Sequence, residues 1–131
     1  MIRYEHSAEA VNADQLNGFF EGWPNPPAAS THLAILKRSD YVVLALDGRP
    51  VVGFITAISD GVLSAYIPLL EVLPTYRKRG IGSELVRRML EKLRGLYMVD
   101  LVCDPEMQDF YARLGMKAYT AMIIRNVDSA G

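Results

Sequence analysis

The stretch of sequence that decides the fold of this chain reads Leu70-Glu71-Val72-Leu73-Pro74-Thr75-Tyr76-Arg77-Lys78-Arg79-Gly80-Ile81-Gly82-Ser83-Glu84-Leu85. It predicts the end of a strand, a loop rich in arginine, lysine and glycine, and the start of a helix. At a helix start several backbone N–H groups lack an intrahelical partner, and the helix dipole places partial positive charge there. Glycines in the loop allow the backbone to approach a ligand closely. Together these features describe an anion site suited to a pyrophosphate.

A Gly-x-Gly spacing alone is a weak signal, because a basic loop at a tight helix start explains it without any ligand. Two common nucleotide-binding motifs are excluded. The chain has no G-x-x-x-x-G-K-[ST] sequence, and no G-x-G-x-x-G opens near its N-terminus with a ribose-binding acid. The function therefore depends on what surrounds this loop.

Hydrophobic periodicity and turn dipeptides predict the elements on both sides of the loop. The expected strands cover residues 2–4, 41–46, 51–58, 62–73, 97–103 and 117–125. The expected helices begin at Asn12 and reach Phe20, and then cover residues 30–37, 82–94 and 104–115. Asn12 and Gln15 have the spacing of a capping box at the start of the first helix.

Pro68 lies inside the expected strand 62–73. Because proline cannot donate a ladder hydrogen bond, it predicts a bulge or a place where neighbouring strands part. The unit from residue 62 to 103 should form a right-handed parallel crossover, and the other strands should be antiparallel. The predicted fold class is α/β (α+β), with a mixed, mostly antiparallel central sheet, one parallel β-α-β crossover and helices on both faces.

The length of 131 residues predicts one globular domain, residues 1–131. A formal net charge of −1 gives no global attraction to nucleic acid or to a membrane. No apolar run approaches the roughly 18–20 residues that span a bilayer, and we expect no signal peptide. The single cysteine, Cys103, excludes an intrachain disulfide and fits a reducing, cytoplasmic location. His6 and His32 lack metal-ligand spacing, so we expect surface histidines and no metal.

Two motifs in order carry a family resemblance. Val72-x-Pro74-x-Tyr76-Arg77-x-x-Gly80-Ile81-Gly82 resembles the acetyl-CoA signature [RQ]-x-x-G-x-[GA] of the GNAT superfamily of N-acetyltransferases. Downstream, Phe110-Tyr111-Ala112-Arg113-Leu114-Gly115-Met116 resembles the F-Y-x-x-x-G-F helix of that family. The resemblance covers residues 41–125 well, whereas the first forty residues match in layout only. It implies a small, single N-acetyltransferase domain with a GNAT-type sheet and acetyl-CoA as co-substrate.

The resemblance also implies where the cofactor lies. Pantetheine would occupy a V-shaped split between the strands 62–73 and 97–103 and pair with the backbone near Val72. The implied cofactor-binding residues are Val72, Leu73, Arg77, Lys78, Arg79, Gly80, Ile81, Gly82, Ser83, Asp104, Phe110 and Tyr111. Two positions depart from the family pattern. Asp104 stands where many relatives carry asparagine, and an ionised aspartate only accepts hydrogen bonds; Met116 replaces the usual aromatic residue.

Amine acetylation requires a neutral amine, a polarised thioester carbonyl and a proton for the leaving thiolate. Tyr111 resembles the general acid of many relatives, and its ordinary pKa of about 10 keeps the proton on it at neutral pH; a core aromatic is the alternative. Glu71 is the general-base candidate, because burial in an apolar strand would raise its pKa. Its alternative is a solvent-facing or arginine-paired side chain. Phe20 and Trp23 either line the acceptor pocket together with Glu71, or these two aromatic residues belong to a core cluster.

Three functions remain open from the sequence. The first is an N-acetyltransferase that acts on a primary amine of a small molecule by direct attack in a ternary complex. The alternatives are a protein acetyltransferase acting on lysine or an N-terminus, and a non-catalytic CoA-sensing module. No nucleic-acid or membrane partner is expected. The apolar strand 117–125 would leave an unprotected edge, so a homodimer through this strand is expected, and it would also supply the far wall of the acceptor site.

Overall fold

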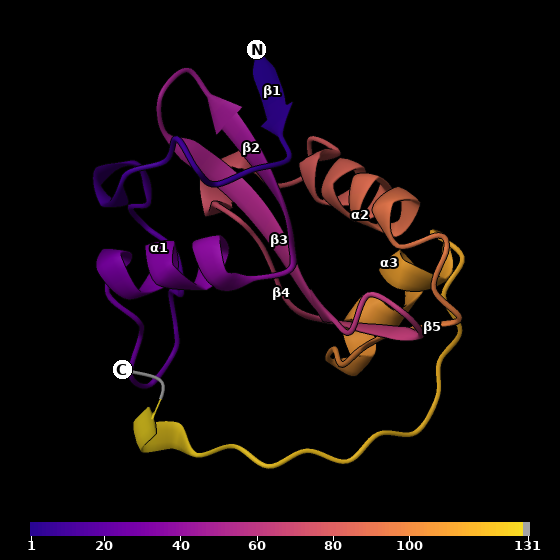
Figure 1. Cartoon of the computed structure of the whole chain (residues 1–131). Helices are drawn as coiled ribbons and strands as arrows, with labels where there is room; N and C mark the ends of the chain where they lie inside the picture. Colours follow the sequence, from indigo (N-terminus) through magenta and orange to yellow (C-terminus); the bar gives the residue numbers. More distant parts are fainter. Residues whose placement is uncertain (130–131) are drawn as a thin grey trace.

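The computed structural model describes residues 1–129 (Figure 1). Its strands are β1 (Ile2–Glu5), β2 (Tyr41–Asp47), β3 (Val51–Ser59), β4 (Ser64–Val72) and β5 (Met98–Leu101), and its helices are α1 (Ala29–Arg38), α2 (Ile81–Lys92) and α3 (Gln108–Ala112). Short 3₁₀ turns cover Ala13–Gln15, Pro74–Tyr76, Pro105–Met107 and Val127–Ser129. The strands form one sheet in the order β1-β2-β3-β4-β5, antiparallel except for the β4–β5 pair. The expected mixed, mostly antiparallel sheet with one parallel crossover is confirmed.

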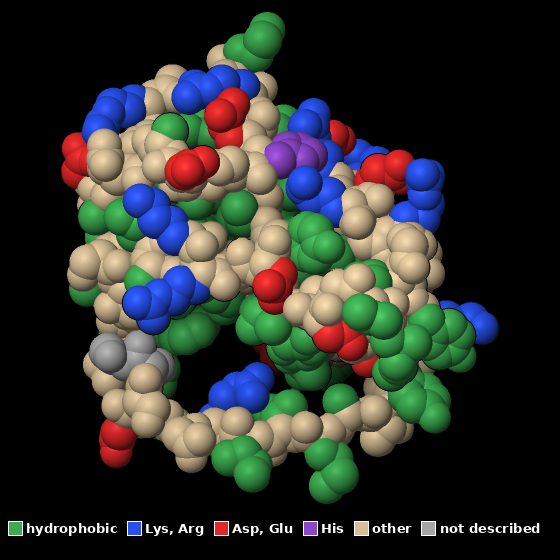
Figure 2. All heavy atoms as spheres, viewed as in Figure 1, with side chains coloured by type: hydrophobic (Ala, Val, Ile, Leu, Met, Phe, Trp, Pro, Cys, Tyr) green, Lys and Arg blue, Asp and Glu red, His purple; other side chains and the backbone are tan. Residues whose placement is uncertain are grey.

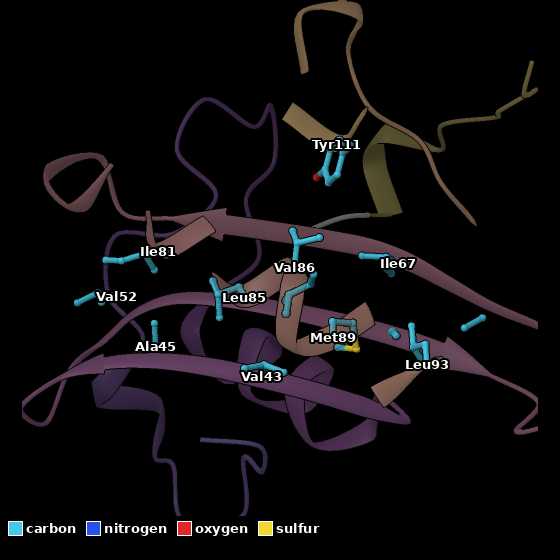
Figure 3. Packing of buried hydrophobic residues seen from close by; sticks show 13 residues of the cluster. Val43, Ala45, Val52, Ile67, Ile81, Leu85, Val86, Met89, Leu93 and Tyr111 are labelled. Carbon is cyan, nitrogen blue, oxygen red and sulfur yellow. The ribbon is translucent and has the colours of Figure 1, made fainter. Parts of the chain in front are cut away.

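The central strands are buried on both faces because α2 covers one face of the sheet and α1 covers the other (Figure 1). In β2, Val43 and Ala45 pack with the α2 side chains Leu85 and Met89. The alternating residues of the same strand join a second cluster with Leu36 of α1. Figure 3 shows the α2 cluster, with Tyr111 at its margin. Because successive strand residues point to opposite faces, one apolar strand supplies both cores.

β4 has a bulge at the predicted position. Thr56 pairs with Leu69 and Ile58 pairs with Tyr66, so β4 carries one extra residue between these two pairs, next to Pro68. The pairing of β4 with β5 covers only Ser64–Ile67 and stops there. The two parallel strands therefore part at the proline, which cannot donate a ladder hydrogen bond.

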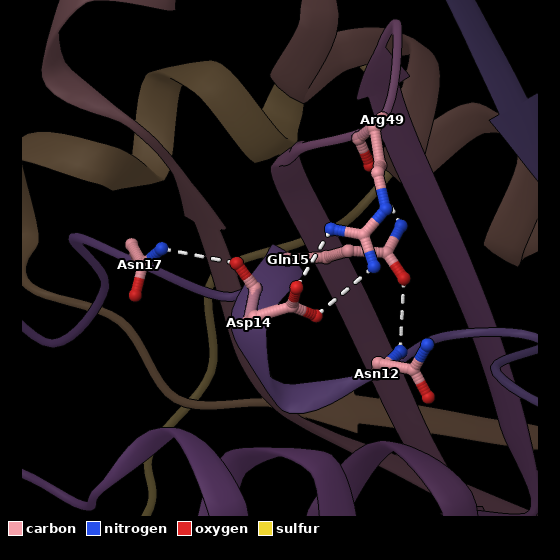
Figure 4. A network of polar contacts seen from close by, with 5 residues as sticks. All are labelled: Asn12, Asp14, Gln15, Asn17 and Arg49. Carbon is pink, nitrogen blue, oxygen red and sulfur yellow. Dashed lines mark hydrogen bonds and ion pairs between the residues drawn. The ribbon is translucent and has the colours of Figure 1, made fainter.

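The expected helix from Asn12 to Phe20 is wrong: only the 3₁₀ turn Ala13–Gln15 forms. Gly18 and Phe20 adopt positive φ angles of 91° and 64°, which are incompatible with a continuing helix. Polar contacts hold the turn instead (Figure 4). The Asn12 N–H donates to the Gln15 side-chain oxygen at 2.9 Å, and the Gln15 amide donates to the Arg49 carbonyl oxygen at 2.7 Å.

The expected strand 117–125 is also wrong. Residues 117–126 have no regular secondary structure, and the segment runs away from α3 along the outside of the molecule (Figure 1). β5 consequently has only one paired edge, and its side chains are half-buried or exposed. A strand forms only where its backbone groups find a ladder partner, and within residues 1–129 this segment has none.

His32 is buried rather than on the surface, because it shares with Leu36 the face of α1 that packs on the sheet. Its side chain is 1% exposed, and its ring centroid lies 4.4 Å from that of Phe54 and 4.8 Å from that of Phe20. Neither ring nitrogen has a hydrogen-bond partner among the described residues. Burial therefore lowers the pKa of His32 to about 4. His6 is exposed, as expected.

We expect His32 to make the fold sensitive to mild acid. Because its pKa is about 4 in the folded chain and about 6.5 when unfolded, the unfolded state takes up the proton first as the pH falls from 6.5 to 4. The free energy of unfolding should drop by about 2 kcal/mol between pH 7 and pH 5. His32→Leu should remove most of that drop in urea titrations at the two pH values, whereas His6→Gln should keep it. An equal drop in His32→Leu and wild type would refute this assignment.

No helix within residues 1–129 combines the length and the apolar character that a membrane crossing requires. The same residues contain no group of three His, Cys, Asp or Glu side chains arranged to hold a metal ion.

Candidate active site

The divergence of β4 and β5 opens a cavity of about 800 Å³. Four segments line it: β4, the loop and helix start at residues 76–83, the end of β5, and the segment 103–113. The lining residues are Ile67, Pro68, Leu70, Glu71, Val72, Tyr76, Arg77, Lys78, Gly80, Ile81, Gly82, Ser83, Leu101, Val102, Cys103, Asp104, Met107, Phe110, Tyr111 and Arg113. The cavity brings together residues that lie more than 30 positions apart in the sequence.

The backbone of β4 turns polar groups toward this cavity. The Leu73 N–H donates to the Val52 carbonyl oxygen at 2.8 Å, so the backbone N–H of Leu73 points toward β3. In an antiparallel ladder successive residues point their N–H groups to opposite sides. The N–H groups of Leu70 and Val72 therefore point away from β3, toward the side where β5 has diverged. They are suitably placed to pair with an extended ligand in the split.

The loop before α2 forms the basic end of the cavity. Lys78 and Gly80 adopt positive φ angles of 64° and 82°, and the helix begins at Ile81 directly after them. Gly82 sits in the first turn, where an added Cβ would lie 3.6 Å from the Phe110 ring and 3.9 Å from the Val72 side chain. The missing side chain at Gly82 thus leaves room beside the helix N-terminus. This space, together with the backbone N–H groups of the first helical turn, fits a pyrophosphate.

Two of the predicted cofactor-binding residues do not line the cavity. The Arg79 guanidinium lies 5.0 Å from the centroid of the Tyr76 ring, where it makes a cation–π contact. Tyr76 is itself held by a 2.6 Å hydrogen bond that its hydroxyl donates to Asp47. Leu73 packs against the α2 core instead. The Arg77 side chain borders the cavity and donates to the Val72 carbonyl oxygen at 2.9 Å, which braces the end of β4.

Tyr111 lies on α3 and borders both the cavity and the hydrophobic core. It is 9% exposed, and burial raises the pKa of its hydroxyl to about 12, with a smaller contribution from the Cys103 thiol. Its hydroxyl forms no hydrogen bond with another group in the described part of the chain. Tyr111 is therefore protonated at neutral pH and has a hydroxyl available to a ligand.

Glu71 lines the same cavity from β4, but its side chain has a structural partner. The Phe20 backbone N–H donates to both carboxylate oxygens of Glu71, at 3.1 and 3.0 Å. Burial raises the pKa of Glu71, and the Phe20 hydrogen bond and the charge of Arg77 only partly oppose that rise. Glu71 is thus neither fully solvated nor ion-paired within hydrogen-bond distance. It joins the loop after the first 3₁₀ turn to the centre of the cavity.

The two aromatic candidates for the acceptor pocket lie outside the cavity. Phe20 is 2% exposed and belongs to the α1 core cluster, and it reaches Glu71 only through its backbone. Trp23 is 42% exposed and stacks edge-on against Phe20 at a centroid distance of 5.0 Å. Trp23 therefore lies at the surface, next to the residue whose backbone N–H binds Glu71.

Several lining residues were not predicted from the sequence. They are Ile67, Pro68, Leu70, Tyr76, Leu101, Val102, Cys103, Met107 and Arg113. Pro68 carried the one usable signal, because a proline within a strand marks the point where the sheet parts. The others are ordinary strand, turn and helix residues. They can be recognised as cavity-lining residues only once the divergence of β4 and β5 is known.

This fold and cavity define a class of protein: a mixed α/β domain whose sheet splits between β4 and β5, with a basic loop and a helix start at the resulting cavity. The chain belongs to the GNAT family, because the model described as "Acetyltransferase (GNAT) family" matches residues 8–116. The resemblance drawn from the two sequence motifs is confirmed.

Solved and curated proteins agree with this assignment. A candidate acetyltransferase from Deinococcus radiodurans R1 is 50% identical and has a TM-score of 0.96, over 98% of this chain and 91% of that one. A GNAT family acetyltransferase from Streptococcus pneumoniae TIGR4 is 31% identical with a TM-score of 0.79, over 96% and 98% of the two chains. The Arabidopsis thaliana protein "GCN5-related N-acetyltransferase 1, chloroplastic" is 33% identical over 116 residues. That match covers 83% of this chain and 58% of the plant protein, so this chain spans little more than half of it.

The Deinococcus structure also bears on the segment after α3. Residues 117–129 make up about a tenth of this chain, and a TM-score of 0.96 over 98% of it requires most of them to superpose. The extended course of this segment is therefore shared with a crystal structure that is 50% identical in sequence.

Proposed function

We propose that this chain transfers an acetyl group from acetyl-CoA to a primary amine of a small molecule, by direct attack in a ternary complex. The observation that supports it is the meeting of three elements in one cavity. These are the N–H groups on the open side of β4, the vacant space at Gly82 beside the α2 N-terminus, and the protonated Tyr111. Family membership supports the same reaction.

Three residues of the chain would each have one role in the proposed acetyl transfer. Bound acetyl-CoA supplies a thioester whose carbonyl carbon accepts the amine nitrogen, while the C–S bond breaks. The Val72 N–H polarises the carbonyl as charge develops on its oxygen. Glu71 accepts one proton from the amine, directly or through water, and Tyr111 donates one to sulfur. The net reaction moves one proton from nitrogen to sulfur, and transfer between the two residues through solvent restores both.

The cofactor would lie with its phosphates at the loop 77–83 and its pantetheine along β4. Arg77, Lys78, Gly80, Ile81, Gly82 and Ser83 would hold the phosphates, and Asp104 and Phe110 would border the pantetheine on the α3 side. Arg79 and Leu73 would act indirectly, since they support the loop and the strand end rather than line the cavity. Trp23 stays a proposed acceptor contact, since its exposed ring packs on Phe20, whose backbone N–H binds Glu71.

Glu71→Gln separates proton transfer from loop anchoring. Glutamine retains an oxygen that can accept from the Phe20 N–H, so we expect the fold and acetyl-CoA binding to persist. It cannot take a proton at working pH, so kcat/KM at neutral pH should fall by about a hundredfold. Higher pH should restore part of the rate, because more of the acceptor is then neutral. In the wild type, the acidic limb of the profile should lie above the ordinary glutamate pKa, because burial raises the pKa of Glu71.

The matched control is Glu9→Gln, which makes the same chemical change at an exposed carboxylate that does not line the cavity. It should leave both the rate and the pH profile unchanged. If Glu71→Gln keeps the wild-type profile and only melts earlier, Glu71 anchors the loop and has no part in proton transfer.

One observation favours a protein acceptor as the second candidate. A further cavity of about 720 Å³ adjoins the first and shares Leu101, Val102, Cys103 and Tyr111 with it, so a single chain leaves the acceptor end open. A CoA-sensing module is the third candidate, although it gives no role to a protonated Tyr111 that lines the same cavity as Glu71. A homodimer remains part of the proposal, supported by the exposed apolar side chains after α3. A reducing, cytoplasmic location likewise stays a proposal based on the single cysteine.

The test is a thiol-release screen with acetyl-CoA against amines, polyamines, amino acids and lysine-containing peptides. We expect at least one small amine to release CoA well above the rate with water alone. Release with peptides only would favour the protein acetyltransferase. Thermal stabilisation by acetyl-CoA without release for any acceptor would favour the sensing module.

A further inference from the structure

The loop before α2 holds one residue in a backbone conformation that its own side chain disfavours. Lys78 has a φ angle of 64°, and only Phe20 shares this property among the non-glycine residues of the described chain. A left-handed conformation is unfavourable for a residue with a β-carbon, and it persists only when the surroundings impose it. Lys78 also lines the cavity at its proposed phosphate end. The contacts that hold Lys78 therefore determine the shape of that end of the site.

The residues on both sides of Lys78 are tied to a single point of the fold. The Tyr76 hydroxyl donates to the Asp47 carboxylate at 2.6 Å, across 29 positions of sequence, at the end of β2. On the other side of Lys78, the Arg79 guanidinium carbon lies 5.0 Å from the centroid of the same Tyr76 ring. The chain thus passes from Tyr76 through Lys78 and returns to Tyr76. Straightening the loop at Lys78 would break one of these two contacts.

Tyr76 connects the loop to the rest of the fold more specifically than a surface ion pair could. Its ring packs against the α2 core cluster and borders the cavity, so the position of the hydroxyl is fixed by packing. Their hydrogen bond lowers the pKa of Asp47 and raises the pKa of Tyr76, so at neutral pH the acceptor is charged and the donor keeps its proton. Figure 2 shows charged side chains of both signs around the end of the molecule at which α2 begins. Exposed ion pairs in such surroundings contribute little, whereas a hydrogen bond to a charged acceptor is among the stronger kinds.

We propose that Asp47 and Tyr76 are positioning residues, which hold the loop 77–80 in its binding conformation before acetyl-CoA arrives. The identity of the ligand rests on the proposed function, whereas the bracing of the loop is a property of the ligand-free chain. A ligand binds only the competent fraction of a protein, so its apparent dissociation constant rises as that fraction falls. Without the Tyr76 hydroxyl, Lys78 would relax toward a negative φ, and the bound phosphates would have to restore the loop.

Two other contacts could be given this role, and neither accounts for the conformation of Lys78. The Arg77 side chain donates to the Val72 carbonyl oxygen at 2.9 Å, which attaches the loop to the end of β4 but acts only before Lys78. The Tyr76 ring borders the cavity and could touch the cofactor directly. In that case the ring would matter and its hydroxyl would not. Tyr76→Phe separates the two possibilities, because it keeps the ring and removes the hydrogen bond to Asp47.

The first test examines the loop without any ligand. Arg77, Lys78 and Arg79 are exposed, and each precedes a bond that trypsin can cleave once the loop opens. Cleavage of a transiently open segment follows the population of its open form. We expect Tyr76→Phe to raise the rate of cleavage at these bonds about tenfold, the effect of losing one hydrogen bond to a charged group. Fragment masses identify the bonds cut, and circular dichroism establishes that the variant is folded.

The controls change the same groups without breaking the brace. Asp47→Asn keeps an oxygen that can accept from Tyr76 and should retain most of the protection, whereas Asp47→Ala should behave like Tyr76→Phe. Tyr4→Phe is the matched control, because the Arg88 guanidinium lies 4.5 Å from the centroid of the Tyr4 ring, which does not line the cavity. It should be cut at the wild-type rate. Cleavage after the exposed Arg94, beyond α2, is the internal reference in every variant.

The second test asks whether the brace acts through the conformation of Lys78. Lys78→Ala and Lys78→Gly both remove the ammonium group, but only glycine adopts a positive φ readily. With Tyr76 intact, the loop is already held, so the two variants should bind acetyl-CoA with similar dissociation constants in calorimetric titrations. Combined with Tyr76→Phe, the glycine variant should bind about tenfold more tightly than the alanine variant, since alanine disfavours the left-handed conformation. A role for Tyr76 in stability alone would not create this difference.

Equal rates of loop cleavage in Tyr76→Phe and wild type would overturn the inference. A ratio of the alanine and glycine dissociation constants that is the same with and without the Tyr76 hydroxyl would also overturn it. The cleavage test needs no ligand, so the two proposals fail separately. A wild-type chain that binds no acetyl-CoA would contradict the proposed function, while faster cleavage of Tyr76→Phe would still support the brace.

Discussion

Gly82→Asp is expected to abolish the thermal stabilisation that acetyl-CoA gives the folded chain. An added Cβ meets only the Phe110 ring and the Val72 side chain, at ordinary contact distances, so we expect the variant to fold. The aspartate side chain projects into the cavity at the α2 N-terminus and brings a negative charge to the proposed phosphate site. At a ligand concentration of about 100 Kd, the wild type should gain about 2.7 kcal/mol of stability and the variant almost none.

Gly95→Asp is the matched control. Gly95 lies beyond the other end of α2, it has open space around its Cβ position, and its φ is not positive. Gly95→Asp adds the same charge roughly 20 Å from Gly82, because the two glycines are separated by the length of α2 at a rise of about 1.5 Å per residue. Melting curves with and without acetyl-CoA should show a full shift for Gly95→Asp. A full shift for folded Gly82→Asp as well would place the cofactor elsewhere.

Tyr111→Phe should lower kcat by about ten- to a thousandfold with little change in acetyl-CoA affinity. Only the hydroxyl is removed, and it makes no hydrogen bond within the described residues, so packing and stability should persist. Tyr97→Phe removes the same group from an 86% exposed ring outside both cavities and should leave kcat unchanged. Steady-state kinetics with the acceptor found by the screen decides the matter. Equal kcat values for Tyr111→Phe and wild type would exclude Tyr111 as the acid.

The pH profile gives an independent check on Tyr111. Because burial raises its pKa to about 12, the protonated donor persists throughout the neutral and mildly alkaline range. We therefore expect no loss of kcat attributable to Tyr111 below about pH 10, the ordinary tyrosine pKa. A loss that begins near pH 8 and disappears in Tyr111→Phe would show that the hydroxyl ionises far more easily than its burial predicts.

The parts of the fold that sequence pattern predicted well are those set by local chemistry. Asp47-Gly48 and Asp60-Gly61 mark the turns between β2, β3 and β4, and the stripe from Leu85 to Met89 marks the buried face of α2. Pro68 marked the bulge because the missing N–H is a property of the residue itself. The Arg77–Gly82 loop was found for the same reason, since charge and glycine content can be read without knowing any neighbour.

Local pattern failed where the outcome depends on distant partners. The apolar residues from Leu16 to Phe20 suggested a helix, but the loop turns at Gly18 and Phe20 to place the Phe20 N–H on Glu71, 51 positions away. His32 looked like a surface residue until α1 packed on the sheet and buried it. Residues 117–125 had the composition of a strand, but no ladder partner for them exists within the described chain.

The sequence was therefore sufficient for the family, for five of the six expected strands and for the basic loop, because turn dipeptides, periodicity and motif spacing act over a few residues. The assembly of the site needed the folded chain. The direction of the Val72 N–H follows from the register of β4 against β3, and the meeting of Glu71 with Tyr111 follows from the divergence of β4 and β5. Pairing register and strand divergence are properties of contacts between segments far apart in the chain, so no single stretch of sequence encodes them.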